Sequence, residues 1–133
     1  MKLLTILVLT SLAVAQPVEQ SPQQLPAVDH SDPVKVLQAV FSAAETGNLS
    51  QLPSLCHKKV DSDGDVRSIC EMTRDDEDFR DFTKVFAGST IQGPARIEGD
   101  QATVDFTFGP NGPERDEKMN LERHKDKWYL ASF

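Results

Sequence analysis

The sequence predicts an α+β domain, with helices in its earlier part and antiparallel strands in its later part. Apolar residues recur every three or four positions between residues 33 and 87, which is the spacing of one helix face. From about residue 90 they alternate with polar residues, as in strands that bury one face. Because helices and strands are segregated along the chain, an α+β fold is favoured over a parallel α/β sheet. We expect N-terminal helices packed in a curved antiparallel sheet of about four strands.

Two segments at the N-terminus are expected to lie outside this domain. Residues 1–15 combine Lys2, an apolar stretch over residues 3–12 and the triplet Ala13-Val14-Ala15, the layout of a secretory signal peptide cleaved before Gln16. The apolar stretch is too short to span a bilayer, and no later stretch is long enough. Residues 16–31 are rich in proline and glutamine without an apolar period, which predicts a disordered linker. The single domain is predicted over residues 32–133.

The first helix is predicted to begin at Asp32-Pro33 and to end at Gly47. Aspartate caps free amide groups, proline fits the first helical turn, and glycine adopts the left-handed conformation that ends helices. A short second helix is expected over residues 49–55, where Pro53 limits it to one or two turns. The apolar stripe of the first helix comprises Val36, Leu37, Val40, Phe41 and Ala44.

Two further helices are expected before the strands. The helical pattern returns at about Asp65 or Val66, and a second start is expected at Thr73, since the acids at residues 75–78 would favour the positive end of a helix dipole. Gly88 should end this last helix. Its aromatic stripe, Phe79, Phe82 and Phe86, is expected to pack on Val104, Phe106 or Phe108 of the sheet.

Residues that favour bends and turns separate the predicted strands. Residues 91–97 alternate loosely around Gly93-Pro94, which suggests a bend, and residues 98–101 are typical of a tight hairpin turn. Strands are then expected over residues 102–108 and 117–124. Residues 127–133 are apolar on both faces, so we expect this last strand to lie centrally and to be covered on both sides.

The charge balance argues against two classes of partner. Without Lys2, 13 of the 14 basic residues remain against 21 acidic ones, a net charge of −8. Binding to nucleic acid or to an anionic membrane depends on clustered cations, and the sequence has no basic run. No cysteine follows the expected cleavage point, so no lipid anchor is predicted there. We expect the protein to be secreted or periplasmic.

Cys56 and Cys70 are the only cysteines, an even number in a chain with a predicted signal peptide. A disulfide is the expected state in an oxidising compartment, and it would fasten the short helix to the start of the next one. A free thiol pair or a metal site is the alternative. A metal site needs more ligands, and of the three histidines only His57 adjoins a cysteine, so no metal and no cofactor are predicted.

Residues 61–65 read Asp-Ser-Asp-Gly-Asp, which raises the question of a calcium loop. An EF-hand loop that starts at Asp61 needs glycine at its sixth position and glutamate at its twelfth, where this chain has Val66 and Met72. A solvated, helix-capping loop is therefore expected, with calcium as the alternative. The mixed charge runs at residues 74–78 and 114–118 are expected to be solvated faces.

Three stretches together resemble the nuclear-transport-factor-2-like superfamily: PVKVLQAVFSAAETGN (residues 33–48), the hairpin over residues 88–108 with IEGDQATVDFTF, and KDKWYLASF (residues 125–133). More narrowly, the chain is similar to small secreted bacterial domains of that superfamily, in which LCHKKVDSDGDVRSIC (residues 55–70) looks like a recurring element. The resemblance covers about residues 33–133 and implies a cone-shaped α+β fold. It implies no particular activity, because this fold hosts enzymes, binding modules and dimerisation domains.

A concavity between sheet and helices is the predicted binding site. In isomerase-like relatives an acid acts as base beside a tyrosine and a second, protonated acid. Here Tyr129 is the sole tyrosine and Asp105 the only acid inside the clearest strand, so no catalytic residue is assigned. Arg123 is expected near the mouth, where it would hold an anionic group; alternatively it pairs with an acid at the strand end. The expected lining is Phe106, Met119, Leu121 and Trp128.

The expected function is a secreted or periplasmic, non-enzymatic domain that binds a small apolar or anionic ligand, or a protein partner. One alternative is an isomerase-like or cyclase-like enzyme that acts on a small apolar substrate in the cone. Another is a structural module that forms a homodimer through the open sheet face. A cone filled with side chains would favour binding to a partner or to a second copy of the chain.

Overall fold

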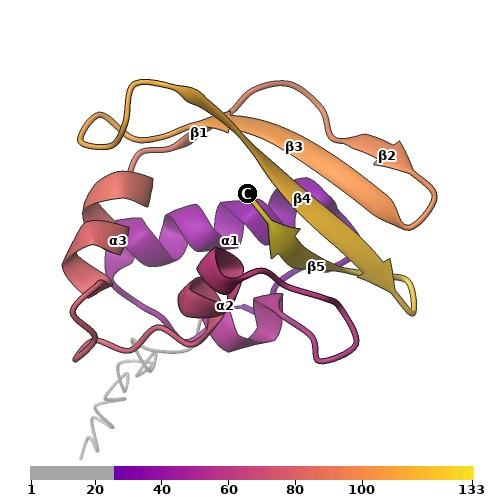
Figure 1. Ribbon diagram of the computed structural model, residues 1–133, viewed down its shortest axis with the longest axis horizontal. Helices are drawn as coiled ribbons and strands as arrows, with labels where there is room; N and C mark the ends of the chain where they lie inside the picture. Colours follow the sequence, from indigo (N-terminus) through magenta and orange to yellow (C-terminus); the bar gives the residue numbers. More distant parts are fainter. Residues whose placement is uncertain (1–25) are drawn as a thin grey trace, which may run out of the picture.

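The computed structural model describes residues 26–133 and has the segregated α+β order that the sequence predicts (Figure 1). The predicted signal peptide and residues 16–25 of the predicted linker lie outside the described residues. The strands form one antiparallel sheet in the order β1-β3-β4-β5, with β2 also paired to β3. The elements are α1 (Pro33–Thr46), the 3-10 helix η1 (Leu52–Leu55), α2 (Gly64–Cys70), α3 (Phe79–Phe86), β1 (Thr90–Ile91), β2 (Arg96–Glu98), β3 (Gln101–Thr107), β4 (Asp116–His124) and β5 (Lys127–Ser132).

Helix α1 begins and ends where the sequence predicts. An Asp32 carboxylate oxygen accepts a hydrogen bond from the Val34 amide at 2.9 Å, which satisfies one of the free amides of the first turn. Gly47 has φ 70°, and its amide donates to the Ala43 carbonyl oxygen at 2.9 Å. Helix α1 lies beneath the sheet (Figure 1), and the residues of its apolar stripe are buried.

The expected helix start at Thr73 is wrong, because α3 begins at Phe79. The acids before it form turns instead: an Asp76 carboxylate oxygen accepts from the Asp78 amide at 3.3 Å. Short acidic side chains compete in this way with the helical hydrogen bonds of the backbone. The short helix expected over residues 49–55 is also shorter than predicted, because only the 3-10 helix η1 forms there.

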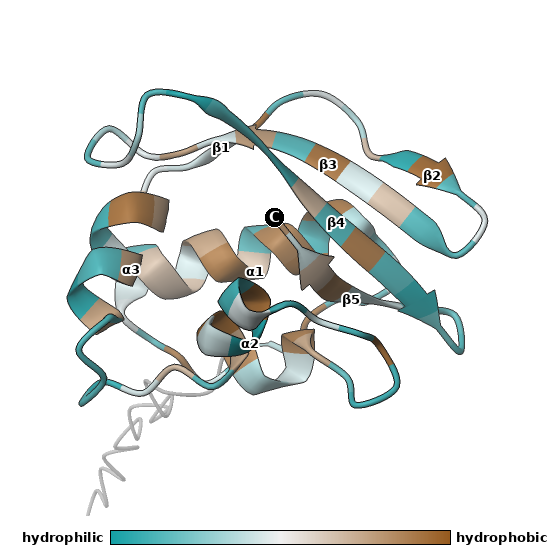
Figure 2. Ribbon diagram, in the orientation of Figure 1, coloured by the Kyte–Doolittle hydropathy of each residue, from teal (hydrophilic) through white to brown (hydrophobic). Residues whose placement is uncertain are grey.

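The predicted bend and the predicted hairpin turn between the strands are both confirmed. The sheet is interrupted between β1 and β2, around Gly93, and residues 99 and 100 form the turn from β2 to β3. Side chains of β3 and β4 alternate between the buried face and the exposed face, as their hydropathy does in Figure 2. The register pairs Val104 with Met119 and Ala102 with Leu121 on the buried face.

The predicted central position of the last strand is wrong, since β5 lies at one end of the sheet and pairs only with β4. Two other parts of the chain cover its free edge. The Trp128 amide donates to the His30 carbonyl oxygen, and the Asp63 amide donates to the Ala131 carbonyl oxygen, both at 2.8 Å. An edge strand otherwise leaves such groups unpaired. This cover, together with side chains over Tyr129, explains why an edge strand is apolar on both faces.

The core between α1, α3 and the sheet contains a cluster of phenylalanines centred on Phe86. Its ring lies 5.5 Å from Phe108, 6.4 Å from Phe106 and 5.4 Å from Phe82, measured between ring centroids. The predicted packing of the aromatic helix stripe on the sheet is thus confirmed for Phe86, whose side chain is 5% exposed.

Candidate functional site

The apolar residues expected to line the concavity are buried in this structure. All four expected lining residues lie in the hydrophobic core together with the apolar stripe of α1. A ligand would have to displace core side chains to contact them, because they are almost inaccessible to solvent. Their exposed fractions are 0% for Phe106, 0% for Met119, 1% for Leu121 and 3% for Trp128.

Arg123 follows the alternative interpretation and pairs with an acid at the strand end. Its guanidinium donates to an Asp100 carboxylate oxygen and to the Gly99 carbonyl oxygen, each at 3.1 Å. The same guanidinium lies over the Trp128 ring, 5.2 Å from its centroid. These three contacts occupy Arg123 in fastening the β2–β3 turn to β4.

The acid and the tyrosine weighed for catalysis both lie on the exposed face of the sheet, away from the core. Asp105 is paired with Arg96 and Lys118, and the hydrogen bonds from Arg96 hold the pKa of its carboxyl below the ordinary value. The face around it is polar: Thr103 donates to Asn120 at 3.2 Å. This face therefore presents neither a catalytic pair nor an apolar surface.

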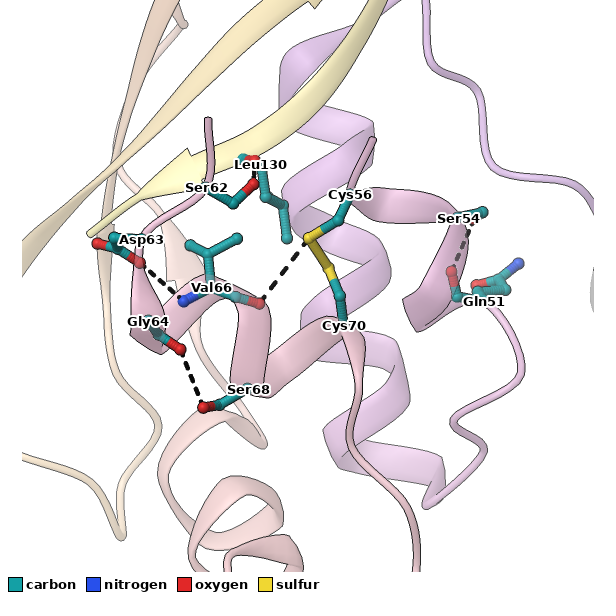
Figure 3. Close-up of a disulfide and its surroundings, with 10 residues drawn as sticks. All are labelled: Gln51, Ser54, Cys56, Ser62, Asp63, Gly64, Val66, Ser68, Cys70 and Leu130. Atoms are coloured by element: carbon teal, nitrogen blue, oxygen red, sulfur yellow. Dashed lines mark hydrogen bonds between the residues drawn. A yellow bond between two sulfur atoms is a disulfide. The ribbon is translucent and has the colours of Figure 1, made fainter. Parts of the chain in front are cut away.

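The disulfide between Cys56 and Cys70 is confirmed (Figure 3), but it joins the residue after η1 to the last residue of α2 and not to the start of that helix as expected, because α2 already begins at Gly64. Within the loop that it closes, the Ser62 hydroxyl donates to the Leu130 carbonyl oxygen at 2.8 Å. An Asp63 carboxylate oxygen accepts from the Val66 amide at 2.8 Å and caps α2, as the helix-capping interpretation of this loop predicts. Among residues 26–133, no three His, Cys, Asp or Glu side chains are placed to share a metal ion.

All three histidines of the chain gather around its only tyrosine. The centroid of the Tyr129 ring lies 5.0 Å from that of His30 and 4.9 Å from that of His57, and the rings of His57 and His124 are 4.8 Å apart. We call these four residues the histidine cluster. They come from the segment before α1, the disulfide loop and the β4–β5 hairpin, which the fold brings together beside the edge of β5.

Hydrogen bonds place the proton of the neutral ring on different nitrogens in His30 and His57. His30 Nδ1 lies 2.8 Å from the Trp128 carbonyl oxygen, which only accepts, so this nitrogen carries a proton. His57 Nδ1 instead accepts from the Lys59 amide at 3.0 Å, so the neutral ring carries its proton on Nε2. Adding a proton to Nδ1 of His57 would therefore break its bond to the loop.

Basic side chains surround the histidine cluster. Lys58 and Lys59 follow His57 in the loop, Lys125 follows His124 at the hairpin tip, and Lys127 pairs with His124 across the hairpin. None of the four lysines forms an ion pair with any residue of the described chain. We call the surface formed by His57, Lys58, Lys59, His124, Lys125 and Lys127 the basic face.

Burial and nearby charges both lower the pKa of His57. Partial burial first, and then the positive charges of His124, Lys58, Lys125 and Lys59, lower the pKa of this imidazole below its ordinary value. A groove of about 580 Å³ runs along the loop beside it. The groove is lined by three cations of the loop and α2 and by two acids, namely Lys58, Lys59, Arg67, Asp61 and Glu71.

Lys125, at the tip of the β4–β5 hairpin, has an energetically unfavourable backbone conformation. Lys125 and Asp126 have φ of 49° and 63°, so two successive residues adopt the left-handed region in a two-residue turn. Asn-Gly or Asp-Gly is the usual choice there, because a side chain in this region costs roughly 1–2 kcal/mol. The chain keeps a lysine at a position where turn geometry favours asparagine.

Sequence reasoning missed this site. His124 and Tyr129 lie on adjacent strands of a predictable hairpin, so their proximity could have been found from the register. Nothing in the sequence pattern brings His30 or His57 to the same place. Residues 57–59, His-Lys-Lys, are too short a stretch to count as a basic run, and the four lysines become a patch only in the folded chain.

Comparison of the chain with protein-family models, with curated proteins and with solved structures finds no match. Of the helices described between residues 26 and 133, none has the length and apolarity needed to cross a bilayer.

Proposed function

We propose that the protein is a non-enzymatic binding domain of an oxidising compartment, and that its basic face recognises a short acidic segment of a partner protein. The observation that carries this proposal is the gathering of four lysines without ion-pair partners in the described chain around adjacent histidine rings, in a chain with net charge −7. Such clusters attract and orient anionic partners. The disulfide supports an oxidising compartment, where such bonds persist, and the predicted signal peptide agrees with secretion.

The size and surroundings of the basic face favour a short acidic segment over a long polyanion. Acidic residues dominate the rest of the described surface, for example over residues 75–78; Asp126 lies between Lys125 and Lys127 in the hairpin turn, and Asp61 lines the groove beside the basic face. A long polyanion would extend over these acids and be repelled, whereas a few carboxylates would fit the patch alone. Lysine ammonium groups are mobile point charges that accommodate carboxylates in varied positions.

Two other functions have less support. Ligand or substrate binding in a cone, as the superfamily resemblance implies, needs access to Phe106 and Met119, which are buried against the helices. A homodimer through the sheet needs an apolar open face, whereas this face carries ion pairs and polar side chains such as Thr103 and Asn120.

The proposal is tested with a fluorescently labelled, terminally blocked hexa-aspartate peptide and fluorescence anisotropy at low salt. We expect saturable binding that weakens as salt increases. Substituting Lys58, Lys59 and Lys125 together by glutamine should weaken binding about tenfold, since each exposed charge contributes up to about 1 kcal/mol. Lys84→Gln on α3, another lysine that forms no ion pair with the described residues, is the matched control and should bind as the wild type does.

A single substitution separates binding from folding. Lys125→Asn should weaken peptide binding while raising the melting temperature, because asparagine adopts the left-handed conformation of the hairpin tip more readily. A loss of binding in a more stable protein cannot come from unfolding. No saturable binding by the wild type, or equal binding by the triple variant, would exclude the basic face as the recognition surface.

A further inference from the structure

We infer that His57 couples recognition of the acidic segment to uptake of a proton, so that the basic face binds more tightly as the pH falls. The inference rests on the function proposed above and assigns a regulation to the same surface. It follows from the position of His57 between two aromatic rings, from the hydrogen bond that its Nδ1 accepts, and from the charges around it.

The hydrogen bonds make His57 a two-state element. In the neutral ring, Nδ1 accepts from the Lys59 amide at 3.0 Å, a bond within the loop, while the ring itself lies against His124 and Tyr129 of the hairpin. Protonation converts Nδ1 to a donor, which cannot accept from an amide, so the ring loses this bond and gains a positive charge with two N–H donors. His30 behaves differently, since its Nδ1 already donates to the Trp128 carbonyl oxygen and a second proton on Nε2 leaves that bond intact.

The charges that face His57 oppose its protonation in the free protein. Lys58 and Lys59 come from its own loop, and His124 and Lys125 come from the hairpin packed against it. Tyr129 contributes an aromatic ring on one side of His57. Four acids lie on the neighbouring elements: Asp61 and Glu71 line the groove along the loop, Glu122 pairs with Tyr129 across the strands, and Asp126 lies in the hairpin turn.

An acidic segment on the basic face reverses this balance. Its carboxylates place negative charge beside His57, which stabilises the protonated ring that the lysines destabilise. Binding and protonation are therefore linked, and each favours the other by the same factor. Histidine is suited to this role because its charge changes in the range between about pH 5 and about pH 8, where aspartate and lysine do not titrate.

The test uses calorimetric titration of the hexa-aspartate peptide into the full domain at about pH 7.5 and about pH 5.5, a range in which the peptide stays ionised. We expect the wild type to bind several-fold more tightly at the lower pH and to take up protons, which is detected by comparing two buffers with different heats of ionisation. The contribution of His57 to this ratio should be about fivefold, as one exposed charge pair predicts.

The informative variant is His57→Asn. Asparagine accepts from an amide two residues further along, so it replaces the bond to Lys59 without being able to bind a proton. Because the readout is the ratio of affinities at the two pH values within one variant, any change in baseline affinity cancels. The variant should lose most of the rise, while Lys84→Gln retains it. Nuclear magnetic resonance of the imidazole protons should show that the peptide raises the pKa of His57.

The outcomes separate the two proposals. Absence of peptide binding at both pH values overturns the proposed function and this inference with it. Binding whose pH ratio is unchanged in His57→Asn, or a His57 pKa that the peptide does not move, overturns the inference alone and leaves the basic face as a binding surface that His57 does not regulate.

Discussion

Replacing Cys56 and Cys70 together by alanine should lower the free energy of unfolding by about 3 kcal/mol. The two cysteines are 14 positions apart, so the disulfide closes a loop of about 15 residues, and removing the link restores about 10 cal/mol/K of chain entropy to the unfolded state. Native contacts change little, because Ser62 and Asp63 still bind to β5. Alanine is preferred to serine because Cys70 is 6% exposed and a buried hydroxyl would add its own penalty.

The measurement is urea unfolding followed by circular dichroism, with and without a reducing agent. The reduced wild type should match the double variant, and the variant itself should not respond to reductant. The slope of free energy against urea should also rise, since an unfolded chain without the link exposes more surface. A loss below about 1 kcal/mol with an unchanged slope would mean that the loop is already restrained in the unfolded state, and the loop-entropy reasoning would be refuted.

Three further predictions concern the fold. Phe86→Ala should cost about 3–5 kcal/mol in thermal or urea unfolding, because the ring is 5% exposed and contacts other aromatic rings; Phe86→Leu should cost less because leucine fills part of the space, and equal losses would contradict the cavity as the source of the cost. Asp32→Ala should cost about 1 kcal/mol by removing the cap of α1, whereas Asp32→Ser should be nearly neutral if the cap is the cause. Arg96→Gln should destabilise the protein at neutral pH but not in acid: the low pKa of Asp105 adds stability that is present above about pH 4 and is lost as the pH falls through the folded-state pKa. A difference between wild type and variant that stays constant down to about pH 2 would contradict that ion pair as its source.

Local signals in the sequence predicted the ends of α1 and the course of the strands. Asp32 and Gly47 act through their own backbone neighbours, so their effect is readable without the fold. The start of α3 was mispredicted because the acids at residues 75–78 suit both a helix N-terminus and the turns that they form. The choice between the two depends on tertiary contacts, such as the hydrogen bond from Arg74 to the Gly47 carbonyl oxygen at 2.9 Å.

The candidate site was less predictable than the fold because it is made by long-range contacts. Alternation placed Phe106, Met119, Leu121 and Trp128 on the inner face, but whether that face encloses a cavity depends on how α1 fills it. The apolar character of residues 127–133 predicts a central strand, but an edge strand covered by side chains and loops from elsewhere has the same local pattern. His30 and His57 reach Tyr129 only through that cover.

The contacts that cover the edge of β5 also affect how fast the chain folds and when it is prone to aggregate. The contact between His30 and Trp128 joins residues 98 positions apart, so the last strand is completed only when nearly the whole chain is in place. Closing such distant contacts slows folding, and until then β5 presents unpaired backbone groups to its neighbours. Intermolecular strand pairing during that interval is the expected route to aggregation. Loss of the segment around His30 would make the exposure permanent.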